Sequence, residues 1–316
     1  MANTTDVFEF VLLGFPGLSE KFHLVVSLIF FLMYNVSLFS NGLVIALIIQ
    51  REHLHQPMYV IIGNLALSDL IFDTLTLPKI IAKYWFRDDS LSFNACFFQM
   101  FFVHNLGSLD SFIIMLMAVD RFVAICKPLH YCSIITNKVV SIFCFIFWLI
   151  AAAVGLGIAV MGARLPYCGP NKIRNCFCSL TPVAVLSCVD SIVTRRTVFT
   201  IALVVHLFPL SYIISSYAII IWKIHLMTHF GNWQNLLYTC TTHWLVIFLY
   251  FVPRLAVYVY NQFQLISNAD VNTLLICIYT FVPHFISPII YCLRTEEIKQ
   301  TLRKVFLNMV SLSLGK

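Results

Sequence analysis

Long apolar runs dominate the pattern of hydrophobic and polar positions along this chain of 316 residues. Each run is long enough to cross the hydrocarbon core of a bilayer as a helix, which takes about 20 residues. The runs cover residues 24–49, 58–82, 97–120, 139–161, 197–222, 237–260 and 272–293. Short polar breaks separate them, except for a longer break at 162–196. The pattern predicts an all-α membrane protein, a bundle of seven transmembrane helices.

Composition supports a membrane protein. Charged residues make up 11% of the chain, against about 25% in soluble domains, and the mean hydropathy is +0.89. The net charge of +6 is scattered along the chain, which favours contact with anionic membrane lipid and excludes nucleic acid as a partner. The sequence contains no phosphate-binding loop and no zinc-ligand spacing.

An odd number of spans places the two termini on opposite sides of the membrane. Residues 1–20 lack a cleavable signal peptide, and Asn3 begins a glycosylation tripeptide. The sequence therefore predicts an extracellular N-terminus at 1–23, a seven-span transmembrane bundle at 24–293, and a cytoplasmic helix and tail at 294–316. The break at 162–196 carries several basic residues, which runs against the positive-inside rule. Cysteines support the orientation, because five of them fall in two segments on the outer side, where disulfides form: Cys96, Cys168, Cys176, Cys178 and Cys188.

The third run ends in MLMAVDRFVAICKPLHY at 115–131, with the charged pair Asp120 and Arg121 at its foot. Charges are costly at the centre of a membrane helix, at roughly 2.5–3.5 kcal/mol each. The plain interpretation is an arginine that extends to the interface. The alternative is a functional cation at the inner end of the bundle.

Further motifs distinguish these interpretations. They are LHQPMY at 54–59, KPLHY at 127–131, TCTTH at 239–243, YFVP at 250–253 and SPIIYCLRTEEIK at 287–299. With seven spans, a cysteine heading the third span and Asp-Arg at its foot, the chain resembles the rhodopsin-like G protein-coupled receptors, specifically the odorant (olfactory) receptors, and most of all their fish-like class.

The resemblance implies a receptor and not an enzyme. Such a receptor binds a small organic odorant from the extracellular side and activates a stimulatory, olfactory-type heterotrimeric G protein, which raises cyclic AMP. It implies a multi-pass protein of the plasma membrane, in the cilia of olfactory neurons, with a short amphipathic C-terminal helix. Arg121 then switches between Asp120 and the G protein, with Tyr217 and Tyr291 as the tyrosines that meet it.

The resemblance also suggests a sodium ion held by Asp69 and Asp110, with Asn41 and Ser108 nearby, and no other cofactor. The alternative is a protonated carboxyl group hydrogen-bonded inside the bundle, because two close carboxylates do not both ionise cheaply. For the disulfides it implies Cys96–Cys178 and Cys168–Cys188. Sequence alone does not fix this connectivity, so Cys176 could take the place of Cys178.

The family's ligand pocket lies between the third, fifth and sixth spans. Residues at helical spacing on two of these spans are predicted to line it: His104, Gly107, Ser108, Ser111, Phe251, Arg254, Tyr258 and Gln262. Arg254 cannot lose its charge, so it predicts a ligand with a carboxylate or another strong acceptor. The alternative is that Arg254 pairs with an acid elsewhere or extends outward.

Two other classes of protein compete with this interpretation. In a transporter or channel, Asp69, Asp110 and Arg254 would line an ion path, but the sequence lacks the repeated halves of such proteins. A non-olfactory receptor of the same fold usually has tryptophan where this chain has Phe251.

Overall fold

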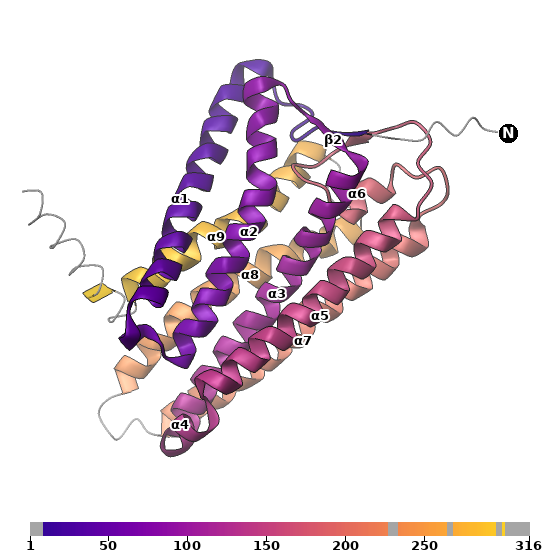
Figure 1. Cartoon of the computed structure of the whole chain (residues 1–316). Helices are drawn as coiled ribbons and strands as arrows, with labels where there is room; N and C mark the ends of the chain where they lie inside the picture. The colour runs from indigo at the N-terminus through magenta and orange to yellow at the C-terminus, as the bar shows by residue number, and fades with distance from the viewer. Residues whose placement is uncertain (1–8, 227–232, 264–267, 295–298, 301–316) are drawn as a thin grey trace, which may run out of the picture.

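The computed structural model describes residues 9–226, 233–263, 268–294 and 299–300. Within this part of the chain, seven long helices form one bundle, one helix for each apolar run (Figure 1). They are α1 (His23–Gln50), α2 (Pro57–Phe86), α3 (Phe93–Cys126), α5 (Asn137–Ala163), α7 (Ile192–Leu226), α8 (Trp233–Gln262) and α9 (Ala269–Arg294). The predicted fold class is confirmed. Asn3 and most of the predicted C-terminal helix lie outside the described residues.

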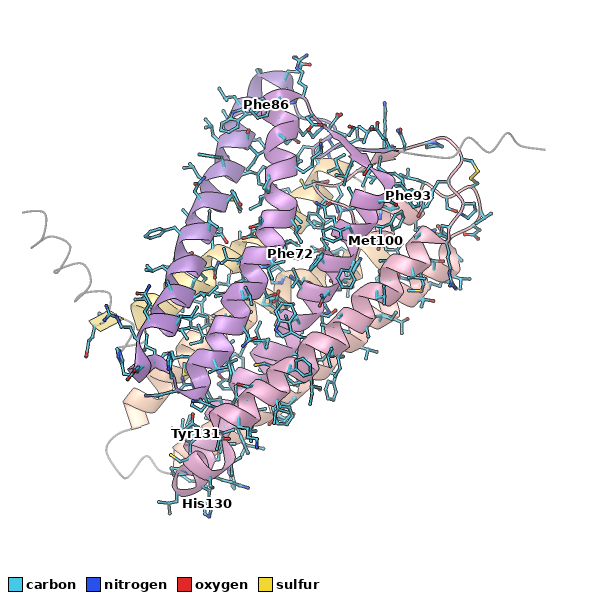
Figure 2. All side chains as sticks on the ribbon, in the orientation of Figure 1. Phe72, Phe86, Phe93, Met100, His130 and Tyr131 are labelled. Carbon is cyan, nitrogen blue, oxygen red and sulfur yellow. A yellow bond between two sulfur atoms is a disulfide. The ribbon has the colours of Figure 1, made fainter. Side chains whose placement is uncertain are left out.

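Short elements close the two ends of the bundle. They are the strands β1 (Glu9–Leu12), β2 (Ser90–Ser92) and β3 (Lys172–Ile173), the short helices α4 (Tyr131–Ile134) and α6 (Leu180–Ala184), and the 3₁₀ turns η1 (Glu20–Phe22), η2 (Glu52–Leu54) and η3 (Pro128–His130). The strands and α6 lie at one end together with the disulfide bonds, and this end is called the disulfide end. His130 and Tyr131 mark the opposite end (Figure 2).

Six helices of the described chain are long and apolar enough to cross a membrane, and α3 is the long helix outside this set. α3 is less apolar because it lies inside the bundle, where it contacts α2, α5, α7 and α8. Its polar residues Asn105, Asp110 and Ser111 are buried against these helices. Polar side chains inside a membrane are tolerated where they face the bundle interior. The polar character of α3 therefore follows from its central place.

The outward faces of the bundle are apolar. Leu32 and Phe39 of α1 are 61% and 71% exposed, and Phe145 of α5 is 64% exposed. Extended exposed apolar surface marks a membrane or protein contact. Here it lies on helices of membrane-spanning length, so it is the lipid-facing surface.

A glycine allows α3 and α5 to pack closely. A Cβ atom on Gly155 of α5 would lie 2.6 Å from the backbone oxygen of Phe101 and 2.9 Å from the backbone nitrogen of Asn105 in α3. Small residues at such crossings let the backbones of membrane helices approach. Gly157, two residues further along α5, has open space where its Cβ would be.

A small sheet that the apolar pattern did not predict lies at the disulfide end. Its strand order is β2-β1-β3, with β1 antiparallel to β2 and parallel to β3. Phe10 and Leu12 of β1 are fully buried, and the ring of Phe10 packs on Phe93, Phe97 and Tyr167. The N-terminal strand is thus anchored by side chains as well as by backbone pairing.

The chain after β1 crosses the disulfide end toward α9. Gly14 has a φ of +56° and approaches the Tyr84 hydroxyl too closely for any side chain. The backbone nitrogen of Gly17 then donates to both carboxylate oxygens of Asp270, at 3.0 and 3.1 Å. Residues 9–17, called here the N-terminal strap, therefore connect the sheet to the start of α9.

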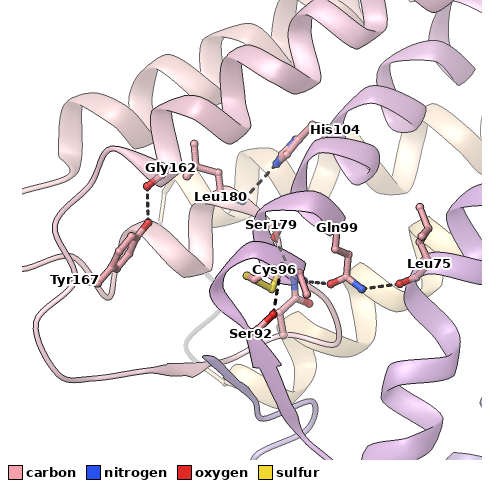
Figure 3. Close-up of a disulfide and its surroundings, with 12 residues drawn as sticks. Leu75, Ser92, Cys96, Gln99, His104, Gly162, Tyr167, Ser179 and Leu180 are labelled. Atoms are coloured by element: carbon pink, nitrogen blue, oxygen red, sulfur yellow. Dashed lines mark hydrogen bonds between the residues drawn. A yellow bond between two sulfur atoms is a disulfide. The ribbon is translucent and has the colours of Figure 1, made fainter. Parts of the chain in front are cut away.

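Two disulfide bonds fix the long segment between α5 and α7. They join Cys96 to Cys178 and Cys168 to Cys188, the pairing that the resemblance implies. Gln99 supports the first bond, because its Oε1 accepts from the Cys178 nitrogen and its Nε2 donates to the Leu75 oxygen, both at 2.7 Å (Figure 3). Cys176 is a separate buried thiol.

Candidate functional site

At the end opposite the disulfides, Arg121 of α3 contacts two other helices. Its Nε donates to Nε2 of His243 in α8 at 3.2 Å, and its Nη2 donates to Sδ of Met58 in α2. The neighbouring Asp120 carboxylate lies 3.9 Å from Nε. Arg121 therefore ties α3 to α8 more closely than it pairs with Asp120. His243 belongs to the TCTTH motif, but no feature of that motif identified it as the partner of Arg121.

Asp120 has a different main partner. The hydroxyl of Tyr131 in α4 donates to its Oδ1 at 2.7 Å. Burial and the adjacent Asp120 raise the pKa of Tyr131, so the hydroxyl keeps its proton and remains a donor. The short helix α4 is thereby held against the foot of α3.

The two predicted tyrosines lie near this contact. The ring of Tyr217 in α7 packs against Trp244 of α8, with centroids 5.1 Å apart. The hydroxyl of Tyr291 in α9 donates to Sδ of Met117 at 3.5 Å, and its ring lies 6.5 Å from that of His243. Both tyrosines therefore adjoin α8 at the level of the contact between Arg121 and His243. Their part in coupling stays a prediction.

The middle of the bundle holds a cluster of acids around one histidine. The imidazole Nε2 of His284 in α9 lies 3.6 Å from Oδ1 of Asp69 and 3.9 Å from Oδ2 of Asp110. Its Nδ1 lies 2.8 Å from Oδ1 of Asp73. All four side chains are buried. The sequence prediction included Asp69 and Asp110 but missed Asp73, one turn beyond Asp69 on α2, and His284.

Hydroxyl groups complete the cluster. Ser37 donates to Oδ2 of Asp73 at 2.5 Å, and Ser68 donates to Oδ1 of Asp110 at 2.6 Å. Ser108, expected near this site, instead donates to the His104 carbonyl within its own helix at 2.7 Å. Asn41 donates to the His284 carbonyl at 3.0 Å, which joins α1 to α9.

This donor set fits a sodium ion poorly. Hard cations prefer oxygen ligands, but here an imidazole nitrogen faces the two carboxylates that were expected to hold the ion. The cavity beside Asp69, lined also by Asn41, Ser287 and Tyr291, has no space for a water molecule. Nε2 of His284 lies 3.6 and 3.9 Å from the two acids, so an ion held here would meet a mixed set of nitrogen and oxygen ligands.

Nearer the disulfide end, Arg254 of α8 is buried among polar and aromatic groups. Its Nη1 donates to the Tyr250 hydroxyl at 2.8 Å and lies 3.3 Å from Nε2 of His206 in α7 and 3.5 Å from the Gly107 carbonyl of α3. The guanidinium carbon lies 4.2 Å above the centre of the Tyr250 ring and 5.3 Å from that of Tyr279 in α9. Four helices thus meet at this one cation.

Arg254 is only 4% exposed, and no carboxylate within the described chain forms an ion pair with it. Its Nε has no hydrogen-bond acceptor. A buried charge normally requires an opposite charge or full hydrogen bonding. The cation–π contacts and neutral acceptors here supply only part of that requirement.

Most of the predicted ligand residues surround Arg254. Ser111 lies 3.2 Å from the Tyr250 hydroxyl, and Phe251 and Tyr258 pack against the ring of His206. His104 faces the disulfide end, where its Nε2 accepts from the Leu180 nitrogen at 3.3 Å. Gln262 is exposed at the end of α8, away from this cluster. The prediction missed His206, Tyr250 and Tyr279. Nothing in the local sequence separates His206 and Tyr279 from core residues, whereas Tyr250 opens the YFVP motif and lies one helical turn before Arg254.

The described chain is a bundle of seven long helices, with Arg121 bonded to His243 at one end and a buried polar cluster around Arg254 nearer the other, an architecture shared with rhodopsin. The crystal structure of squid rhodopsin matches the fold with a TM-score of 0.74 at 16% identity, over 93% of this chain and 88% of that chain.

Sequence comparison then identifies the family. A family model described as "Olfactory receptor" matches residues 30–309. Human Olfactory receptor 6B1 is 34% identical over 309 residues, covering 96% of each chain. Mouse Olfactory receptor 1M1 is 35% identical over 311 residues, covering 98% of each chain. The chain belongs to the olfactory receptor family of G protein-coupled receptors and is a multi-pass membrane protein with a small-molecule ligand and a G protein as partners.

Proposed function

We propose that this receptor recognises small organic ligands carrying a carboxylate or a similar anionic group, and that the anion binds at Arg254. The observation that carries the proposal is a buried guanidinium without an acidic partner among the described residues, with a free Nε. An anion at this position would supply the missing charge. Phe251 and Tyr258 would contact the apolar body of the ligand.

The transmembrane arrangement follows the disulfide bonds. We propose that the disulfide end faces the outside, since disulfides form in the secretory pathway, and that Arg121 faces the cytosol. The receptor then activates a stimulatory, olfactory-type G protein and raises cyclic AMP, at the plasma membrane and in the cilia of olfactory neurons. The contact between Arg121 and His243 supports a closed state in which α8 is held against α3.

A cyclic AMP assay in transfected cells tests the ligand class. Acids and their matched methyl esters are compared on the wild type and on Arg254→Gln. A charge-assisted hydrogen bond contributes about 1.5–3 kcal/mol, so we expect Arg254→Gln to weaken an active acid roughly ten- to a hundredfold and to leave an active ester nearly unchanged.

Arg196→Gln is the matched control, because Arg196 is exposed near the start of α7. Surface expression is measured in parallel. If acid and ester lose potency alike in Arg254→Gln, the guanidinium holds the four helices together and does not select the ligand.

A further inference from the structure

Two thiols that belong to neither disulfide bond lie side by side near the disulfide end. The Sγ atoms of Cys176 and Cys277 are 3.2 Å apart, although 101 residues separate them in the sequence. Cys176 lies in the segment between β3 and α6, and Cys277 lies in α9. Their exposed fractions are 1% and 5%. A disulfide has an S–S length of about 2.05 Å, so only a small displacement separates this contact from a covalent bond.

The surroundings already hold the two sulfur atoms together. Phe177, next to Cys176, packs its ring against Phe281 of α9 with centroids 6.1 Å apart. Phe281 lies one turn after Cys277, on the same face of α9. On the other side, Cys178 is bonded to Cys96 of α3. The segment is thus fixed against α3 by one bond and against α9 by an edge-to-face pair of aromatic rings.

The other free cysteines of the described chain lie elsewhere. Cys126 ends α3 and Cys132 lies in α4, both at the end opposite the disulfides, and Cys144 lies in the first half of α5. Cys176 and Cys277 are therefore the described free thiols nearest the two bonded pairs. The two bonded pairs form in the oxidising secretory pathway, and the segment that carries Cys176 is exposed to the same compartment.

We propose that Cys176 and Cys277 form a third disulfide bond in the mature receptor. The inference rests on the proposed orientation, with the disulfide end outside. The two S–H bonds break and one S–S bond forms, while the two electrons and two protons pass to a protein disulfide of the secretory pathway, which becomes a dithiol. The bond would tie the segment beside His104, and hence the cover of the Arg254 cluster, to α9.

The bond would form as the segment packs. Thiolate is the reactive form in disulfide exchange. In the folded protein, burial and the adjacent Cys277 raise the pKa of Cys176, so exchange after folding is slow. A fraction of receptor that folds before oxidation would keep both thiols, protected from reagents in solution.

Disulfide mapping of the surface-expressed wild type tests the proposal. The receptor is denatured in N-ethylmaleimide, digested with chymotrypsin without reduction, and analysed by mass spectrometry. Cleavage after Phe177 separates Cys176 from Cys178. We expect a peptide pair linking Cys176 to Cys277, which disappears on reduction, together with the Cys96–Cys178 and Cys168–Cys188 pairs.

The same digest distinguishes a failure of the third disulfide bond from a failure of the proposed orientation. If Cys176 and Cys277 carry N-ethylmaleimide while the other two pairs are linked, the third bond does not exist. If all six cysteines carry N-ethylmaleimide, the proposed orientation is wrong as well.

Variants provide a second test that needs no peptide recovery. If the bond exists, Cys176→Ser, Cys277→Ser and the double variant lower the melting temperature of the purified receptor equally, and dithiothreitol removes the difference from the wild type. Cys144→Ser is the control, since it is a buried thiol distant from both. Additive losses in the double variant, with the wild type still more stable than the variants in dithiothreitol, would overturn the proposal.

Discussion

At the residue scale, the contact that most directly concerns signalling is the hydrogen bond from Arg121 to His243. The proposed activation separates α3 from α8 when a G protein binds, and in this structure one side chain on each helix joins them. A switch of this kind needs two states that differ by a few kcal/mol. The net contribution of one hydrogen bond, about 0.5–1.5 kcal/mol, is enough to shift such an equilibrium.

We therefore predict that His243→Ala raises ligand-independent cyclic AMP roughly two- to tenfold, as that range of free energy implies. Arg121→Ala reaches the surface but does not signal. The exposed His130 at the same end gives the control His130→Ala, with basal activity like the wild type. Basal activity unchanged in His243→Ala would show that the closed state does not depend on this contact.

A second prediction at this scale concerns His284. Because its imidazole faces both Asp69 and Asp110, we expect agonist potency to be independent of sodium in the wild type. His284→Ala opens the space between the acids, and potency then becomes sodium-dependent by about fivefold or more, the lower range of allosteric coupling. The measurement is a dose–response series in sodium chloride against N-methylglucamine chloride.

The double variant His284→Ala, Asp69→Asn provides the control and loses the acquired dependence. A wild type whose potency shifts with sodium as strongly as that of His284→Ala would contradict the assignment of His284 to this position.

At the scale of elements, the apolar runs predicted all seven long helices, because each must be long and apolar to cross the bilayer. They did not predict the three-stranded sheet, whose strands are two to four residues long and pair across distant parts of the chain. For a related reason, the sequence did not predict the partners of Arg254. His206 and Tyr279 come from helices other than α8, and only the packing of those helices brings them to Arg254, whereas Tyr250 lies one turn before Arg254 on α8 itself.

Helix packing gives the next prediction. Gly155→Ala places a methyl group against the backbone of α3, and overpacking of this kind typically costs about 1–3 kcal/mol. We expect a lower melting temperature and reduced surface expression. Gly157→Ala, in the same helix with open space around it, should behave like the wild type. Equal behaviour of the two variants would mean that α3 and α5 do not approach each other in this way.

For the whole molecule, the strand pairing of Glu9 with Ser92 places residue 9 at the disulfide end, and we expect Asn3, six residues earlier in the sequence, to be glycosylated. We predict that N-glycosidase increases the gel mobility of the receptor and that Asn3→Gln removes the shift. Asn35 begins a similar tripeptide within α1, where its side chain bonds the Phe31 carbonyl at 2.7 Å, so Asn35→Gln should leave the shift intact. A surface receptor without glycan would contradict the orientation.

The N-terminal strap bears on the rates at which a ligand binds and leaves. For a ligand whose path from the disulfide end crosses residues 9–17, the strap would have to move aside before binding and again before release. Such a gate slows arrival and departure together and leaves the equilibrium affinity unchanged. The receptor would then respond weakly to a brief ligand pulse. Its response to a sustained exposure would continue after the ligand is removed. The bond from Gly17 to Asp270 therefore bears on how fast the receptor can report a changing stimulus.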